Sequence, residues 1–263
     1  MLTISCFNTQ IYYERKGEGS PLVFLHGLGS SSADWQAQIA HFSLNYDVIA
    51  PDFPLHGASG GDISSFSLPH CAEVIEALLD ALGVEKAIVV GISMGGMVGM
   101  ELSIRAPARV ASLVVVNALA ECRPRKAIEW WMLLSRRFLL KFVSVENIAT
   151  LMGKKLLPDP SMKVLREEAV SRWSENHRES YIAAFNAVVN WQVLDKLSQI
   201  TCPLYLISAE HDYTPPSAKK VLAAIYPNGE FSMLAGSHHL APLEHPDLFN
   251  ETLSTWLSSR RTL

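Results

Sequence analysis

The chain has 263 residues, of which 49% are apolar and 18% are charged, and its net charge is −4. A chain of this length and composition can bury one large core. The acidic balance excludes a general nucleic-acid binder, which needs a basic surface. No apolar run reaches the roughly 20 residues that cross a bilayer, so we expect neither a nucleic-acid nor a membrane partner.

The N-terminal segment and the cysteines both indicate a cytoplasmic protein. Residues 1–13 alternate apolar and polar side chains and lack the basic start and apolar centre of a signal peptide. The cysteines lie far apart with no C-x-x-C pair: Cys6, Cys71, Cys122 and Cys202. This usage is typical of reduced thiols rather than of a disulfide framework.

Short apolar segments along the chain predict the strands of a sheet. Residues 2–7 and 11–15 alternate like the strands of a hairpin. The segments that follow are apolar on both faces, as expected for parallel strands covered by helices on each side. These segments are Pro21–Leu25, Tyr46–Ala50, Ala87–Val90, Val110–Val116 and Pro203–Ser208, and Phe231–Ala235 is the last strand.

Helical segments separate these strands. The clearest one runs from Ser67 to Leu82, with Pro69 in its first turn, an apolar stripe along one face, and Gly83 as its stop. Alternation of strand and helix predicts an α/β fold with a doubly wound, mostly parallel sheet.

Residues 120–190 break this alternation. They predict four consecutive helices at Ala127–Phe142, Val145–Lys155, Met162–His177 and Glu179–Asn190. We interpret them as a helical cap inserted after the sixth strand, over the edge of the sheet at which ligands of open α/β sheets bind. The core then comprises residues 1–119 and 191–263.

The segment Gly91-Ile92-Ser93-Met94-Gly95 follows an apolar strand and precedes a helical segment. It has the G-x-S-x-G pattern in the strand–turn–helix context of a nucleophile elbow. Small residues are needed there because the serine occupies a strained turn in which larger side chains would collide with the crossing backbone. Ser93 is therefore the candidate nucleophile.

A serine hydroxyl needs an adjacent base, and the base needs an orienting carboxylate. In sheets of this kind the acid and then the histidine follow late strands. Glu210 and Asp212 come directly after one late strand, and His238 and His239 come after the last one. Either carboxylate and either histidine satisfies this requirement.

Together these motifs resemble the α/β-hydrolase family, especially its small capped esterase and lactonase members, over residues 20–118 and 195–258. His26-Gly27-Leu28-Gly29 is similar to the family's oxyanion loop. His239, with Glu244 and Pro246 behind it, matches the family's closing H-x-x-x-x-E-x-P pattern. The resemblance implies Asp212 as the acid, His239 as the base, and the backbone N–H groups of Leu28 and Met94 as the oxyanion hole.

Two further positions bear on the resemblance. The loop from Asp52 to Ser59 lacks the Arg and the first Gly that relatives usually carry, which leaves the subfamily open. Asn117 follows the sixth strand, where some relatives place the acid, and an amide cannot act as a carboxylate. Ser93 at the elbow excludes the dehalogenase and epoxide hydrolase branches, which place Asp there.

The cap has a basic and an aromatic character. Residues 121–180 contain 12 Lys and Arg against 8 Asp and Glu. Arg123 and Arg125 are candidates for attracting an anionic substrate or an acidic carrier protein, although an ordinary solvated helix face is the simpler interpretation. Trp130 and Trp131 could line an acyl pocket, or could simply pack the cap against the core.

The sequence thus predicts a hydrolase that cleaves a carboxylic ester, thioester or lactone through an acyl-enzyme on Ser93, acting on a small-molecule ester that is free or bound to an acyl carrier. We expect no cofactor, and the histidines lack metal-ligand spacing. Two alternatives stay open. The same side chains could serve C–C bond hydrolysis or a lyase step, and the fold could also serve as a ligand-binding receptor.

Overall fold

The computed structural model describes residues 2–124, 127–189, 191–226 and 228–260. Within these ranges, eight strands form one sheet in the order β1-β2-β4-β3-β5-β6-β7-β8. The β1–β2 and β2–β4 pairs are antiparallel and the others are parallel. This confirms the predicted α/β class with a mostly parallel sheet.

The strands lie close to the predicted segments. They are β1 (Leu2–Cys6), β2 (Thr9–Lys16), β3 (Ser20–Leu25), β4 (Tyr46–Pro51), β5 (Ala87–Ile92), β6 (Val110–Val116), β7 (Leu204–Ala209) and β8 (Gly229–Leu234). The core helices are α1 (Gln36–Phe42), α2 (Leu68–Ala81), α3 (Met94–Arg105), α8 (Pro216–Ile225), α9 (Ala241–Glu244) and α10 (Pro246–Ser258). Short 3-10 helices are η1 (Ser32–Trp35), η2 (Ile63–Ser65), η3 (Pro107–Arg109), η4 (Pro160–Met162) and η5 (Leu194–Gln199).

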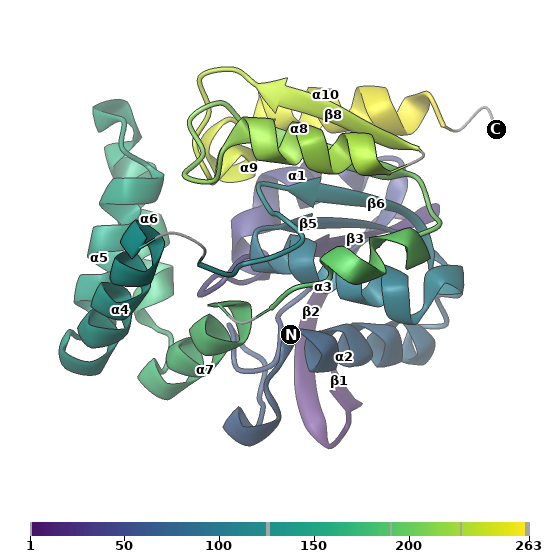
Figure 1. Ribbon diagram of the computed structural model, residues 1–263. Coiled ribbons are helices and arrows are strands. Elements are labelled where there is room, and N and C mark those ends of the chain that lie inside the picture. The colour runs from purple at the N-terminus through teal and green to yellow at the C-terminus, as the bar shows by residue number, and fades with distance from the viewer. Residues whose placement is uncertain (1, 125–126, 190, 227, 261–263) are drawn as a thin grey trace.

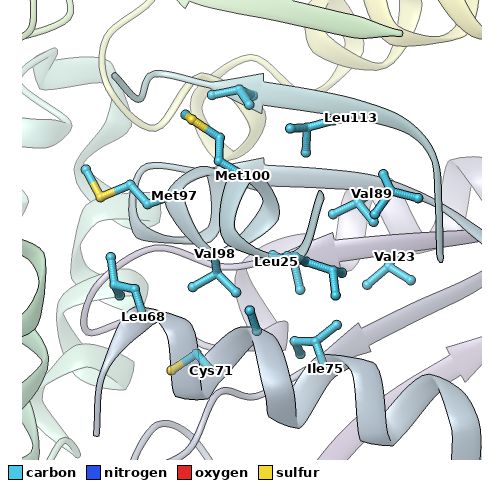
Figure 2. Packing of buried hydrophobic residues seen from close by; sticks show 14 of the residues in the cluster. Val23, Leu25, Leu68, Cys71, Ile75, Val89, Met97, Val98, Met100 and Leu113 are labelled. Atoms are coloured by element: carbon cyan, nitrogen blue, oxygen red, sulfur yellow. The ribbon is translucent and has the colours of Figure 1, made fainter. Parts of the chain in front are cut away.

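Helices cover both faces of the sheet because alternate residues of each buried strand point to opposite sides. In β3, Val23 and Leu25 pack toward α2 and α3, whereas Leu22 and Phe24 pack toward α1 and α10. Figure 2 shows the first of these layers, in which Ile75 of α2 and strand residues such as Val23 and Leu25 lie close together. The core therefore has two layers, one on each side of the sheet.

Four helices lie between β6 and β7 in the described part of the chain. They are α4 (Ala127–Phe142), α5 (Val145–Leu156), α6 (Lys163–Ser174) and α7 (Arg178–Val189). An antiparallel bridge between Glu121 and Gln192 closes the base of this insertion. In Figure 1, α4, α5 and α6 stand to one side of the sheet, with α7 between them and the core. Among the described helices, none is both long and apolar enough to span a bilayer.

The start of α3 lies very close to the strands beside it. A Cβ atom on Gly95 would come within 2.1 Å of the carbonyl oxygen of Leu25, and one on Gly91 would come within 2.3 Å of Gly95. Backbone atoms cannot yield as a flexible side chain can, so both positions require glycine. This close approach fixes the turn between β5 and α3, which carries Ser93.

We expect Gly95→Ala to lower the free energy of unfolding by about 3 kcal/mol, because the added methyl overpacks rigid backbone. Gly60→Ala is the matched control, since its Cβ would meet nothing closer than 3.8 Å, and its effect should stay within about 0.5 kcal/mol. Urea unfolding at neutral pH measures both. Equal stability of the two variants would contradict the proposed steric constraint.

Candidate active site

Ser93 lies in the turn between β5 and α3. Its backbone angles, φ 53° and ψ −118°, are in a region that side chains other than glycine rarely adopt. The Ser93 N–H donates to the carbonyl of Val116 at 2.9 Å, which ties the turn to the end of β6. The strained turn presents the half-buried hydroxyl at the edge of the sheet.

A cavity of about 200 Å³ lies between this edge and the cap. Core residues Gly27, Leu28, Ser93, Tyr213 and His239 form part of its wall. Apolar cap residues form much of the rest, namely Ile148, Ala149, Met152, Leu156, Phe185, Val188 and Val189. Such a mainly apolar cavity with a few polar groups is typical of small-molecule sites.

His239 contacts Asp212 and lines the same cavity as Ser93. The Nδ1 of His239 lies 2.6 Å from Oδ1 of Asp212, and the Asp212 side chain is fully buried. An ionised carboxylate only accepts, so in the neutral form of the imidazole Nδ1 carries the proton and Nε2 keeps its lone pair. The parallel neighbours β7 and β8 end at the same edge of the sheet, so the loops that follow them meet there.

Glu210 and His238, the alternative candidates for the acid and the base, make hydrogen bonds to other groups. Glu210 accepts a hydrogen bond from the N–H of Gly236 at 2.8 Å, on the surface. His238 lies 2.7 Å from Oε1 of Glu244, and its N–H donates to Oε2 of the same buried carboxylate. Glu244 therefore fixes the turn that presents His239.

A buried lysine, which the sequence analysis did not single out, completes the surroundings of Asp212. The Lys219 ammonium donates to Asp212 Oδ2, to the Thr214 carbonyl at 2.9 Å and to the Ser208 hydroxyl at 3.2 Å. The Thr214 hydroxyl donates to the same carboxylate oxygen. The sequence signal that could have indicated its burial is the position of Lys219 on α8, three and four residues before the buried Leu222 and Ala223.

These partners govern the charge on Asp212. Burial would raise its pKa, but the hydrogen bond and charge of His239, together with the charge of Lys219, overcome that cost and lower the pKa to about 2. Because the folded-state pKa is below the ordinary value, ionised Asp212 stabilises the fold above about pH 4, and this contribution is lost as the pH falls through about 2.

Asn117 binds the backbone of the loop that carries His239. Its Nδ2 donates to the carbonyl of His239 at 2.7 Å, and its Oδ1 accepts from the N–H of Ala209 at 2.8 Å. The residue has a φ of 50° at the end of β6. The amide thus links the ends of β6 and β7 to the backbone of His239, a role that a carboxylate, lacking a donor, could not fill.

Tyr213 occupies the space in front of the imidazole. Its hydroxyl donates to Nε2 of His239 at 3.2 Å, and the two ring centroids are 4.3 Å apart. Tyr213 is 55% exposed as a residue, but desolvation of its hydroxyl end raises the pKa of the phenol to about 12, while hydrogen bonding to Ser93 acts in the opposite direction. The phenol therefore lies beside both the hydroxyl and the imidazole, a contact that no sequence pattern indicated.

The loop after β3 lines the cavity through Gly27 and Leu28, and a histidine fixes its backbone. His26 accepts from the N–H of Phe53 at Nε2 (3.0 Å), so its Nδ1 donates to the carbonyl of Gly27 at 2.8 Å. In a trans peptide the carbonyl and the following N–H point in opposite directions. Fixing the Gly27 carbonyl therefore orients the N–H of Leu28. Within the described residues, neither Leu28 nor Met94 donates its N–H to a backbone carbonyl.

The cap residues that line the cavity differ from those expected to contact a substrate. Trp130 and Trp131 are 49% and 65% exposed, and neither lines the cavity. Arg123 is also exposed and outside the wall, and Arg125 lies outside the described residues. The cations that line the cavity are instead Arg136 and Lys155. Among the described side chains, no cluster of three or more could hold a metal ion.

Comparison with known proteins places these features in a family context. The sequence pattern of the Alpha/beta hydrolase family matches residues 22–252. The chain is similar to a putative carbamate hydrolase RutD of Azorhizobium caulinodans, with 30% identity over 94% of each chain. It is also similar to 3-oxoadipate enol-lactonase 2 of Acinetobacter baylyi, with 27% identity over 95% of this chain and 94% of that one. The enol-lactonase structure from Burkholderia xenovorans has a TM-score of 0.90 at 20% identity, covering 98% of this chain and all of the other.

We expect Lys219→Met to lower the free energy of unfolding at pH 7 by about 3 kcal/mol, because it leaves a buried carboxylate without its cation. Lys220→Met removes the same charge from the exposed neighbouring position and should change stability by less than about 0.5 kcal/mol. Chemical denaturation of the two variants makes the comparison. A loss below about 1 kcal/mol for Lys219→Met would show that the pair contributes little.

Proposed function

The chain belongs to the Alpha/beta hydrolase family, and we propose that it is a serine hydrolase that cleaves a carboxylic ester, thioester or lactone through an acyl-enzyme on Ser93. In this proposal His239 is the general base, Asp212 orients it, and no cofactor takes part. Solved structures that are less than 25% identical to this chain support only its fold. The proposed chemistry rests on the geometry of the site.

The observation that supports the proposal most strongly is the state of the His239 imidazole. Its Nδ1–H is held by Asp212 at 2.6 Å, which leaves Nε2 as an unprotonated base on the wall of the cavity that Ser93 also lines. A binding protein has no need for a base oriented by a buried carboxylate and placed beside a hydroxyl in a strained turn.

The chemistry then proceeds in two halves. His239 Nε2 removes the proton of Ser93 as the hydroxyl oxygen attacks the substrate carbonyl, and the resulting imidazolium is stabilised by Asp212. The imidazolium gives its proton to the leaving group as the tetrahedral intermediate collapses to the acyl-enzyme. A water molecule, deprotonated by the same nitrogen, then releases the acid and restores Ser93.

The negative charge that develops on the carbonyl oxygen needs donors that are already in place. We assign this role to the N–H groups of Leu28 and Met94, since the first is oriented by the His26–Gly27 contact and the second begins α3. A helix N-terminus favours negative charge. One such donor is typically worth about 3–4 kcal/mol of the barrier.

Before this reaction can occur, the Tyr213 hydroxyl must leave Nε2. A lone pair that accepts a hydrogen bond from the phenol at 3.2 Å cannot at the same time accept the serine proton. We propose that the substrate displaces this hydroxyl as it occupies the cavity. Nε2 of His239 then becomes free to contact Ser93.

The names of the relatives indicate the bonds to test. One is a putative carbamate hydrolase and another an enol-lactonase, so in both cases an acyl carbon bound to oxygen or nitrogen is the target. For this chain we propose the same kind of carbonyl. The cavity of about 200 Å³ lies below the usual range for ligand sites, which favours a compact substrate.

Ser93→Ala should abolish turnover of a 4-nitrophenyl ester while leaving the circular dichroism spectrum and the stability of the fold unchanged. In the native protein, a burst of 4-nitrophenol and an acyl adduct mapped to Ser93 by mass spectrometry are expected. Activity near the native level in Ser93→Ala would refute the assignment. A C–C hydrolase or lyase with the same side chains would show neither burst nor adduct.

Asp212→Asn should lower kcat by about 10⁴-fold, because the amide no longer selects the tautomer with a free Nε2. Glu210→Gln is the matched control, since it makes the same change two residues earlier at an exposed side chain, and its kcat should stay within twofold. Steady-state kinetics with the same ester decides between them. A larger loss in Glu210→Gln would move the acid to position 210.

A further inference from the structure

Two cationic side chains of the cap line the cavity without a carboxylate partner among the described residues. Arg136 comes from α4 and Lys155 from α5, and both belong to the same wall as Ser93 and His239. The described salt bridges of the chain include neither residue. Arg136 is half-buried, and a positive charge in that position carries an energetic cost unless an anion offsets it, whereas Lys155 is also exposed to solvent.

Arg136 is held in place by neutral groups. Its Nη2 donates to the hydroxyl of Tyr181 at 2.9 Å, and its guanidinium carbon lies 4.8 Å from the centre of the Phe185 ring. Phe185 is buried and Tyr181 nearly so, so the guanidinium is positioned without being neutralised. Such a planar group can still bind a carboxylate through two parallel hydrogen bonds.

Lys155 lies on the catalytic side of the same cavity. Its ammonium nitrogen is 5.2 Å from the centre of the Tyr213 ring, and that ring contacts the imidazole of His239. Although Lys155 is exposed to solvent, partial desolvation and the nearby positive charge of Arg136 lower the pKa of its ammonium, while the charge of Asp212 opposes them. The two cations are therefore close enough to repel each other electrostatically.

The acidic side chain of Asp34, which also lines the cavity, is already neutralised. Its carboxylate accepts from Arg172 at 2.5 Å, from the Trp173 indole at 3.1 Å and from the Ser30 hydroxyl at 2.5 Å. Asp212, behind His239, is paired with Lys219. Neither carboxylate remains to balance Arg136 and Lys155, so the described residues that line the cavity carry an excess of positive charge.

We propose that the substrate carries a free carboxylate in addition to its scissile carbonyl, and that Arg136 and Lys155 bind this carboxylate while Ser93 attacks the carbonyl. The inference rests on the proposed serine hydrolase function and specifies its substrate class. The basic residues that select the substrate are thus inside the cavity, unlike Arg123 on the outer surface.

Several properties of the wall fit a carboxylate. A carboxylate matches the geometry of a guanidinium edge, and a charge-assisted hydrogen bond in a site of low dielectric is strong. The apolar side chains of Ile148, Met152 and Leu156 suit the methylene groups between the carboxylate and the ester. A neutral ester of the same length would leave both cations without a counter-charge.

The test compares two esters that differ only in this charge. The probes are mono-4-nitrophenyl adipate and its analogue with the distal carboxylate capped as a methyl ester, together with the glutarate and pimelate pairs to vary the spacing. For at least one spacing, kcat/KM should be at least about tenfold higher for the free acid. A preference for the capped ester at every spacing would overturn the proposal.

Arg136→Met and Lys155→Met should each reduce this acid-to-capped-ester ratio by about tenfold. The matched controls are Arg137→Met and Lys154→Met, which remove the same charges from adjacent positions that do not line the cavity and should leave the ratio within twofold. If the controls reduce the ratio as much as the two cavity variants do, general attraction by the cap explains the preference and the proposed site is wrong.

Binding to Ser93→Ala separates this inference from the proposed function. Calorimetry with adipate, which has no ester bond, requires no turnover. Adipate should bind Ser93→Ala at least tenfold more tightly than dimethyl adipate, and the additional change Arg136→Met should remove the difference. If no ester is turned over but adipate binds in this way, the hydrolase function fails and the anion site stands. Equal binding of the two compounds would refute the anion site.

Discussion

The carboxylate of Asp212 is the group on which the arrangement of the site depends. It is fully buried, and a charge in that position is tolerated only if each of its oxygens has a partner. One oxygen accepts from His239, and the other accepts from Lys219 and Thr214. The loops after β7 and β8 and the first turns of α8 are thereby connected through one charge. A change in any of these elements alters the orientation of the imidazole.

The pairing of charges differs between the two sides of the cavity. On the core side, the two carboxylates nearest the cavity are paired: Asp212 with Lys219, and Asp34 with Arg172, which reaches it from α6 of the cap. On the cap side, Arg136 rests on aromatic and hydroxyl groups and keeps its charge unbalanced. The core thus holds the imidazole of His239 in a fixed orientation, and the cap contributes the cations that line the cavity.

Much of the fold could be predicted because its signals are local. The buried strands are continuous apolar runs, and the nucleophile elbow needs Gly91 and Gly95 within a few residues of Ser93, so both are readable without knowledge of distant contacts. The choice of His239 over His238 depended instead on family spacing. The structure then showed a physical distinction between them, because His238 is engaged by Glu244.

The features that sequence reasoning missed depend on where a side chain points. The aromatic residues of α4 suggested a pocket, but among the described side chains of that helix Leu133 and Leu140, seven residues apart, are the buried ones, and Trp130 and Trp131 are exposed. Tyr213 follows the acid in sequence, yet its contact with His239 arises from the direction of its ring. Composition cannot distinguish the two faces of a helix or the rotamer of a loop residue.

The attachment of α6 to the loop after β3 has a consequence for how molecules reach the cavity. Arg172 and Trp173 hold Asp34, and the following Asn176 donates to the carbonyl of Gly29 at 2.7 Å. Swinging α6 outward would pull this loop, and with it the N–H of Leu28, out of position. A route that keeps the site assembled therefore leaves α6 stationary and uses motion elsewhere in the insertion. Any hinge that opens the cavity therefore lies in a part of the insertion other than α6.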